Sequence, residues 1–264
     1  MNDISQVTKK ILIINVCVFV VYNVLNIDLV GKFGMYNVTS QNFHVYQLIT
    51  HLFVHANVGH LFSNMLTLLS FGPALEYKLS SKRFVIFYLI TGVCASIFYL
   101  IVSYIMQYRT HAEYMHYFMN PDPKFFDNYL KQFPNLYNNY YGFIYDFLHD
   151  SNNIALIEKS KSISAQLYTI KDVPIIGASG AVFGVLTAFA MLYKEARVSF
   201  LLLPIPFPAK YFVVFYGLYE FFSGINGSIF DNIAHFAHVG GIMVAYILVK
   251  LWYKDKNKHY IEID

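Results

Sequence analysis

Charged side chains are scarce in this chain. Asp, Glu, Lys and Arg make up 13% of the 264 residues, whereas 56% are hydrophobic and 19% are aromatic. An ordinary soluble domain carries about 25% charged residues. The apolar residues gather into long runs, and each crossing of a bilayer needs about 20 mainly apolar residues. A soluble globular protein is therefore excluded, and the composition indicates a membrane protein with several spans in a single domain, 1–264.

Three other features are rare or missing. Both cysteines, Cys17 and Cys94, lie inside apolar runs, where a thiol behaves as a small hydrophobe, so we expect neither a disulfide nor a cysteine metal site. The net charge is only +3, and the basic residues form no patch with interleaved aromatics, so nucleic acid is not an expected partner. No small-residue cleavage site follows the first apolar run, which we expect to remain as a span.

Six apolar segments predict six membrane-spanning helices, because each carries few or no charges over most of the length that a span needs. The segment between the third and fourth spans, 107–172, is instead rich in Tyr, Asn, Lys and Asp and is interrupted by prolines. We expect it to be a loop or small cap outside the lipid. The predicted fold is an all-α, six-helix membrane bundle with this insertion, and its spans are 11–27, 58–75, 84–106, 178–193, 211–222 and 233–253.

The basic residues predict the orientation, because Lys and Arg near span ends prefer the cytoplasm. They gather before the first span, between the second and third, between the fourth and fifth, and after the sixth, whereas only Lys32 lies between the first two spans. Both termini are therefore expected in the cytoplasm, and 107–172 on the outer side. The short N-terminus lacks an Arg-rich transit segment, which favours a bacterial-type plasma membrane.

Polar residues inside spans are costly in lipid, so each needs an explanation. In this topology, the second, fourth and sixth spans all enter from the outer face. Ser179 begins the fourth span, His238 lies early in the sixth, and His60 and Asn64 share one face of the second. With a rise of about 1.5 Å per residue, all four lie within roughly the outer 10 Å of the bilayer. The sequence therefore predicts that they form one cluster.

This cluster contains the groups that nucleophilic acyl transfer needs. A serine hydroxyl becomes reactive when a neighbouring base takes its proton, and neutral histidine is the usual base near physiological pH. Ser179 and His238 fit these roles, although His235, one turn away, is a competing base. His60, Asn64 and the Ser179 backbone N–H are expected to donate hydrogen bonds to the oxyanion of the tetrahedral intermediate. Taken alone, each of these polar residues in a membrane helix is more often a packing or hydrogen-bonding feature than a catalytic residue.

Small residues predict that the fourth and sixth spans pack closely enough for Ser179 to touch His238. Membrane helices approach backbone to backbone where small residues repeat every four positions. The fourth span has Gly180 and Gly184 at this spacing, and the sixth has small residues to match, Gly240, Gly241 and Ala245.

An acidic third member of the site is not expected. Asp172 lies outside the spans, Glu76 lies near the cytoplasmic end of the second span, and Glu220 comes late in the fifth. The sequence therefore predicts a Ser-His dyad rather than a triad.

These residues fall in three motifs that together resemble a known family. The motifs are HLFVHANVGHLFSN at 51–64, Gly-Ala-Ser-Gly at 177–180 and His-Val-Gly-Gly at 238–241. In this order they closely resemble the rhomboid intramembrane serine proteases, over all of the chain except 107–172. The resemblance implies Ser179 as nucleophile, His238 as general base, and His60 and Asn64 as oxyanion partners, with no cofactor and no metal. It also implies cleavage of single-span membrane proteins near the outer face.

The same resemblance also implies roles for two further residues, Glu76 and Phe183. Glu76, which closes the second span, matches a position that family members often fill with Glu, where it is structural. Phe183 stands where some members carry a tyrosine that packs on the base, and we expect the stacking to survive the change.

Two other function classes are open. A rhomboid-like pseudoprotease would bind membrane helices without cleaving them, although it would not need to keep both Ser179 and His238. A metal transporter could use the histidines, yet the intramembrane carboxylates that usually accompany such pathways are scarce. Its candidate ligands would be His51, His55, His60, His235 and His238, of which we expect His51 and His55 to be structural contacts of the first outer loop.

Overall fold

The computed structural model describes residues 5–38, 40–131, 133–169, 173–200, 203–226 and 234–254. The chain forms two compact units. The first unit consists of Met1–Val102 with Pro174–Asp264, and the second is Ser103–Val173. The predicted insertion, 107–172, falls inside the second unit, although its last residues, 170–172, lie outside the described residues.

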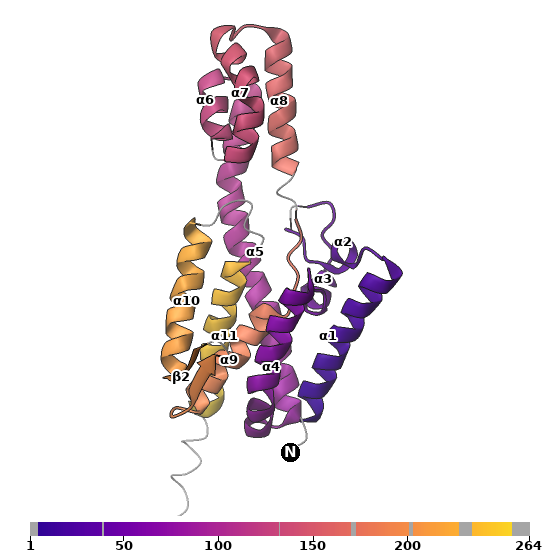
Figure 1. Cartoon of the computed structure of the whole chain (residues 1–264), viewed down its shortest axis with the longest axis vertical. Coiled ribbons are helices and arrows are strands. Elements are labelled where there is room, and N and C mark those ends of the chain that lie inside the picture. The colour runs from indigo at the N-terminus through magenta and orange to yellow at the C-terminus, as the bar shows by residue number, and fades with distance from the viewer. Residues whose placement is uncertain are drawn as a thin grey trace, which may run out of the picture. The chain divides into compact units, whose positions relative to one another are not determined.

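Six helices match the six predicted spans, and the all-α fold class is confirmed (Figure 1). The third of them continues beyond its span into the second unit. The predicted first residue of the last span, 233, lies outside the described residues. The six helices are α1 (Gln6–Leu25), α4 (Val58–Leu79), α5 (Ser81–Met119), α9 (Ser179–Leu192), α10 (Ala209–Asn226) and α11 (His235–Lys254).

Among the described helices, three are long and apolar enough to cross a membrane by themselves: Gln6–Leu25, Ser81–Ile105 and His235–Tyr253. The other three fall short for two reasons. Helix α9 is apolar but has only 14 residues. Helices α4 and α10 are long enough but less apolar, because polar residues such as Asn64 and Glu220 lie among their hydrophobic ones.

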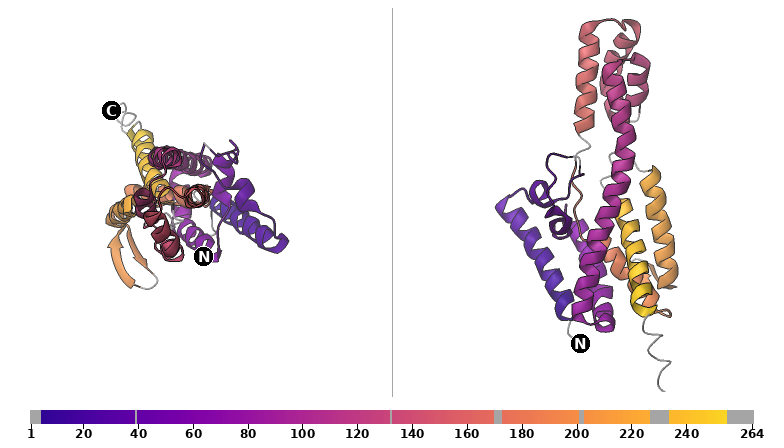
Figure 2. Two further views of the ribbon diagram at one scale, coloured as in Figure 1. Left: turned by 90° about the horizontal axis from the view of Figure 1, so that it is seen from above. Right: turned by 180° about the vertical axis from the view of Figure 1, so that it is seen from behind.

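Helix α9 is surrounded by protein. It contacts α4, α10 and α11 (Figures 1 and 2), and every residue from Gly180 to Ala188 is buried. At about 1.5 Å per residue its length is about 21 Å, shorter than the hydrocarbon core of about 30 Å. Helix α9 is therefore shorter than one full crossing, and Ser179 begins a helix that its neighbours enclose.

Glu76 ties the beginning of α1 to the end of α4. Its buried carboxylate accepts hydrogen bonds from the backbone N–H of Val7 (3.1 Å) and of Thr8 (2.8 Å), and from the hydroxyls of Ser5 (2.6 Å), Thr8 (2.9 Å) and Ser81 (2.6 Å). The first N–H groups of a helix have no partner within it and favour a negative charge. Glu76 therefore caps α1 from another helix.

Replacing Glu76 by alanine is expected to lower the free energy of unfolding in detergent micelles by about 3 kcal/mol, because buried donors at the start of α1 would lose their acceptor. Thermal unfolding followed by circular dichroism measures the change. Glu195→Ala removes an exposed carboxylate and serves as the control, with an expected change within about 0.5 kcal/mol. Equal effects of the two substitutions would contradict the capping role.

Short elements between α1 and α4 hold the segment that leads to Ser179. They are α2 (Leu29–Phe33), α3 (Gln47–Thr50) and the 3-10 helix η1 (His51–Phe53). Met35 pairs with Ile175 in an isolated antiparallel β-bridge, and the N–H of Gly177 donates to the carbonyl of His51 at 2.9 Å. These backbone bonds fix the path of 175–177 directly before α9.

The second unit is helical, which contradicts the predicted loop and is compatible with the other prediction, a small cap. It contains the end of α5 with α6 (Pro123–Leu130), α7 (Pro134–His149) and α8 (Ile154–Thr169). Two of the prolines read as breakers begin helices instead, at the position where the missing N–H costs nothing. Aromatic side chains that made the segment look irregular form a core of their own, including Tyr117, Phe126 and Phe147.

A small β-hairpin, which the sequence did not predict, connects α9 to α10. Its strands are β1 (Arg197–Phe200) and β2 (Leu203–Pro208), paired antiparallel with Arg197 opposite Pro208 and Val198 opposite Phe207. The hairpin projects from the helices of the first unit (Figure 2). It lies at the end of α9 remote from Ser179 and contributes no residue to the site described next.

Candidate active site

The structure brings Ser179 and His238 into contact. Ser179 is the first residue of α9, and His238 lies in the first turn of α11. Nε2 of the His238 ring is 2.8 Å from Oγ of Ser179, within hydrogen-bond distance. His238 is buried, whereas Ser179 is partly exposed. A buried imidazole therefore meets the hydroxyl of a serine that remains partly exposed.

The predicted glycine faces explain this approach. A Cβ placed on Gly241 of α11 would overlap the carbonyl oxygen of Gly180 in α9, and one placed on Gly180 would lie 3.4 Å from the carbonyl oxygen of Ala237. Gly240 faces a third helix, because its added Cβ would lie 3.1 Å from Cα of Ala95 in α5. The two helices that carry the site therefore touch through their backbones, which only residues without a side chain permit.

The substitution Gly241→Ala is expected to destabilise the protein by about 1–3 kcal/mol, because the added methyl group forces α9 and α11 apart. It should also slow the reaction of Ser179 with a fluorophosphonate, since the separation lengthens the Ser179–His238 contact. Gly142→Ala is the control, because a Cβ at Gly142 meets nothing within 4 Å. Thermal unfolding and labelling rates measure both effects, and unchanged labelling in a destabilised Gly241→Ala protein would contradict the geometric role.

Two side chains hold the ring of His238. The Phe183 ring, one turn after Ser179, stacks on it with centroids 4.4 Å apart and planes 14° apart. The predicted stacking is therefore present with Phe183. On the edge remote from Ser179, Nδ1 of His238 lies 2.8 Å from Oε2 of Glu220.

Glu220 corrects the prediction that no acidic residue is placed beside His238. Its carboxylate is buried, 2% exposed, and Oε2 also lies 2.6 Å from Nδ1 of His235. The sequence did contain the signal. Glu220 is six residues before the end of α10 and His238 is in the first turn of α11, and consecutive antiparallel helices bring such positions to the same depth.

His60 lies against the segment that enters α9. Gly177 has a φ of +116°, a conformation that side chains rarely adopt, and a Cβ there would lie 2.6 Å from Nε2 and from Cε1 of His60. Nδ1 of His60 accepts a hydrogen bond of 3.5 Å from the N–H of Ala56. A neutral ring with an accepting Nδ1 carries its proton on Nε2, so the edge of His60 beside Gly177 is a donor.

Asn64 lies one turn after His60 on α4 and is buried, 4% exposed. Its Nδ2 donates to the carbonyl oxygen of His60 at 2.8 Å. A side-chain amide has two N–H donors, so the second remains for another acceptor. The backbone of α4 therefore orients the carboxamide and leaves one of its N–H groups available to donate to another acceptor.

His51 and His55 lie in the connection between α1 and α4, which the sequence predicts to be the first outer loop. Nδ1 of His51 is 2.6 Å from the carbonyl oxygen of Gln47, and burial lowers the pKa of His51 to about 4. Burial, followed by the neighbouring His60, lowers the pKa of His55 to about 4. Both rings are therefore neutral near pH 7. In the part of the chain that the structure describes, neither belongs to a group with metal-ligand spacing, which is found at Glu220, His235 and His238.

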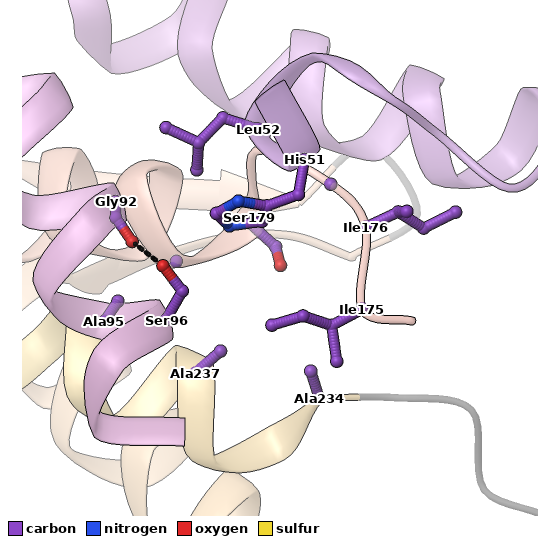
Figure 3. A pocket seen from close by; sticks show the side chains of 12 residues that line it. His51, Leu52, Gly92, Ala95, Ser96, Ile175, Ile176, Ser179, Ala234 and Ala237 are labelled. Carbon is purple, nitrogen blue, oxygen red and sulfur yellow. Dashed lines mark hydrogen bonds between the residues drawn. The ribbon is translucent and has the colours of Figure 1, made fainter. Parts of the chain in front are cut away.

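A small recess of about 10 Å³ reaches Ser179 (Figure 3). In the figure, Gly92, Ala95 and Ser96 of α5 border it on one side and Ala237 of α11 on another. The other residues that line it are His51 and Leu52 of η1, Ile175, Ile176 and Gly177 of the segment before α9, Gly180 of α9, and Ala234, which directly precedes α11. The nucleophile candidate therefore opens on a mainly apolar space.

A comparison with protein families agrees with these motifs. The model of the Rhomboid domain matches residues 42–120 and 153–254. The chain belongs to the rhomboid family. It is accordingly an integral membrane protein with several spans, and Ser179, His238, His60 and Asn64 all lie within the matched ranges. The part of this rhomboid protein that lies between the matched ranges is 121–152, shorter than the predicted insertion. No curated protein matches the chain.

Proposed function

We propose that this rhomboid protein is an intramembrane serine endopeptidase that cleaves single-span membrane proteins near the outer face of the bilayer. The contact of 2.8 Å between Ser179 Oγ and His238 Nε2 carries the proposal. A serine and a histidine at membrane depth are costly unless they serve a purpose. Ser179 is partly exposed and lines a recess, and such a placement is what a nucleophile needs and a purely structural hydrogen bond does not.

The reaction would proceed through an acyl-enzyme. His238 Nε2 takes the proton of Ser179 while Oγ attacks the substrate carbonyl carbon, and the resulting oxyanion accepts hydrogen bonds from the Ser179 N–H, His60 and Asn64. His238 then returns the proton to the departing amine, and the peptide bond breaks. A water, deprotonated by His238, attacks the ester, which releases the new carboxyl end and restores the Ser179 hydroxyl.

The start of α9 suits this chemistry for a second reason. The backbone N–H groups of its first residues point out of the helix without intrahelical acceptors, and the helix dipole places positive charge there. Negative charge that develops on the substrate oxygen beside Ser179 is therefore stabilised by groups already in place. A substrate helix would have to unwind locally before its peptide bond reached them, so helix-destabilising residues near the cut are expected.

The orientation predicted from the basic residues places this site toward the outside, with both termini in the cytoplasm, in a bacterial-type plasma membrane. In that orientation the recess beside Ser179 opens toward the outer headgroups. Water for the second step would then enter from the outer side, and the substrates would be proteins whose single span exposes an unwound segment there.

The test is cleavage of a panel of single-span helices by the full chain in lipid vesicles. We expect cleavage near one end of those spans that contain helix-breaking residues, and no cleavage of matched spans in which leucine replaces these residues. A protein that binds the spans and cleaves none of them would fit a pseudoprotease instead. Mass spectrometry of the fragments identifies the cut bond, and a cut in a water-exposed tail far from the span would contradict the proposal.

A further inference from the structure

A buried carboxylate lies on the side of His238 that faces away from Ser179. Glu220 is 2% exposed, and its Oε2 is 2.8 Å from Nδ1 of His238 and 2.6 Å from Nδ1 of His235. Helix α10, which carries Glu220, packs against both α9 and α11. A carboxylate at this depth is costly in the absence of partners. Two of its short contacts are to imidazole rings, and the Tyr216 side chain also lies beside it, so the site pairs the carboxylate with the proposed base.

We propose that Glu220 is a positioning residue that turns the Ser179–His238 pair into a triad by holding His238 in the reactive tautomer. The inference rests on the proposed function, since a tautomer matters only if His238 acts as a base. It differs from the dyad that the sequence and the family resemblance imply.

The direction of the hydrogen bonds supports this role. An ionised carboxylate accepts and cannot donate, so Nδ1 of His238 carries the proton in the bond to Glu220. A neutral ring then has its lone pair on Nε2, the atom 2.8 Å from Ser179 Oγ. The opposite tautomer would place a lone pair against the carboxylate. Glu220 therefore selects the form of His238 that can take the Ser179 proton, and it stabilises the imidazolium that forms.

His235 has a supporting place in this arrangement. It lies one turn before His238 on α11, and the two rings meet edge to face with centroids 6.4 Å apart. Its Nδ1 shares Oε2 with His238, so it restrains the carboxylate from the other side. His238, and not His235, holds the contact with Ser179. His235 is therefore a partner of Glu220 rather than a competing base.

The short distances favour hydrogen bonding over a resident metal in this group. Two ligand atoms that each lie about 2.0–2.1 Å from a tetrahedral zinc ion are about 3.3 Å apart. The nitrogen–oxygen distances of 2.6 Å and 2.8 Å are shorter than that. They are the usual separation of charge-assisted hydrogen bonds.

The first test is the labelling of purified full-length protein by a fluorophosphonate over a range of probe concentrations. In Glu220→Gln we expect the maximal rate to fall on the order of 10²-fold or more, with the half-saturating concentration unchanged. Glu220→Asp, which keeps the charge, should recover part of the loss. Glu195→Gln, in an exposed position, is the matched control. Glu220→Gln labelled at the wild-type rate would overturn the inference, and thermal unfolding confirms that the variants are folded.

A double-substitution cycle tests whether Glu220 acts through His238. In a His238→Ala background, Glu220→Gln should cause no further loss of labelling, because the group that it positions is gone. An equal fold-loss in both backgrounds would mean that Glu220 supports the fold or the probe site independently, and would overturn the inference.

A third measurement needs no substitution at Glu220. The ¹⁵N NMR shifts of labelled histidine in the wild-type protein should show His238 protonated at Nδ1 and unprotonated at Nε2, with His238→Ala identifying its signals. The opposite tautomer would contradict the role of Glu220.

Loss of labelling on treatment with a chelator, restored by zinc alone, would make Glu220 a metal ligand and would also overturn the inference. If the wild-type protein is not labelled at Ser179 at all, it is the proposed function that fails.

Discussion

Ser179→Ala is expected to abolish cleavage of a single-span substrate in lipid vesicles. The substitution removes the hydroxyl oxygen that lies 2.8 Å from Nε2 of the proposed base, and alanine is compatible with the start of a helix. Because the acyl-enzyme cannot form without that oxygen, the rate should fall by about 10³-fold or more, to the background of the assay. Quantitative separation of fragments over a long incubation measures the residual rate.

The matched control is Ser96→Ala, since Ser96 lines the same recess but donates its hydroxyl to the carbonyl of Gly92 at 2.9 Å. It should keep cleavage within a few-fold of wild type. Thermal unfolding of both variants separates lost chemistry from lost structure. Cleavage that survives in a folded Ser179→Ala protein would contradict the assignment of the nucleophile.

His238→Ala is expected to slow cleavage by about 10²–10⁴-fold, the range that a positioned general base contributes. The hydroxyl of Ser179 would remain, but without an acceptor for its proton. The variant also leaves the carboxylate of Glu220 with fewer partners, so some loss of stability should accompany the loss of rate. Cleavage rates and unfolding temperatures, measured on the same preparation, report the two effects.

Alanine substitutions of two other histidines serve as comparisons for His238→Ala. His149→Ala, an exposed position in the second unit, should leave the rate unchanged. His235→Ala removes a partner of Glu220 but not the contact with Ser179, so it should cost less than His238→Ala. If His235→Ala abolished cleavage and His238→Ala did not, the base would be misassigned.

Much of the site could be predicted because membrane helices have a regular rise and a fixed solvent boundary. The hydropathy pattern located all six helices, and the position of Ser179, His238, His60 and Asn64 within them predicted a common depth. The structure joins Ser179 to His238 directly and places His60 beside Gly177. The glycines of α9 and α11 predicted the close packing that makes the first contact possible.

Glu220 was missed because the sequence indicates how deep a residue lies in the membrane but not which neighbouring helix its side chain faces. A residue late in one helix lies level with a residue early in the next, so the depth of Glu220 already matched that of His238. The hydropathy pattern does not show which helices are neighbours in the bundle. The packing of α10 against α9 and α11 supplies that information, and it converts a residue that seemed remote into the nearest acid.

The helices of the second unit were not predicted, for a different reason. Prolines and polar aromatics predicted an irregular segment, yet Pro123 and Pro134 each begin a helix. Tyrosine and phenylalanine rings such as Tyr117 and Phe126 then form a core without long apolar runs. Composition alone cannot distinguish a loop from short helices whose aromatic faces pack on one another. The hairpin between α9 and α10 was missed likewise, because each of its strands is only a few residues long.

The most direct test of the central claim, that Ser179 is the nucleophile activated by His238, is to locate the fluorophosphonate adduct. The full chain in lipid vesicles is labelled and digested, and the modified residue is identified by mass spectrometry. The predicted result is one adduct on Ser179, which forms in the wild-type protein and forms far more slowly in His238→Ala. An adduct on Ser96 or another serine, or an adduct on Ser179 that forms equally fast without His238, would contradict the claim.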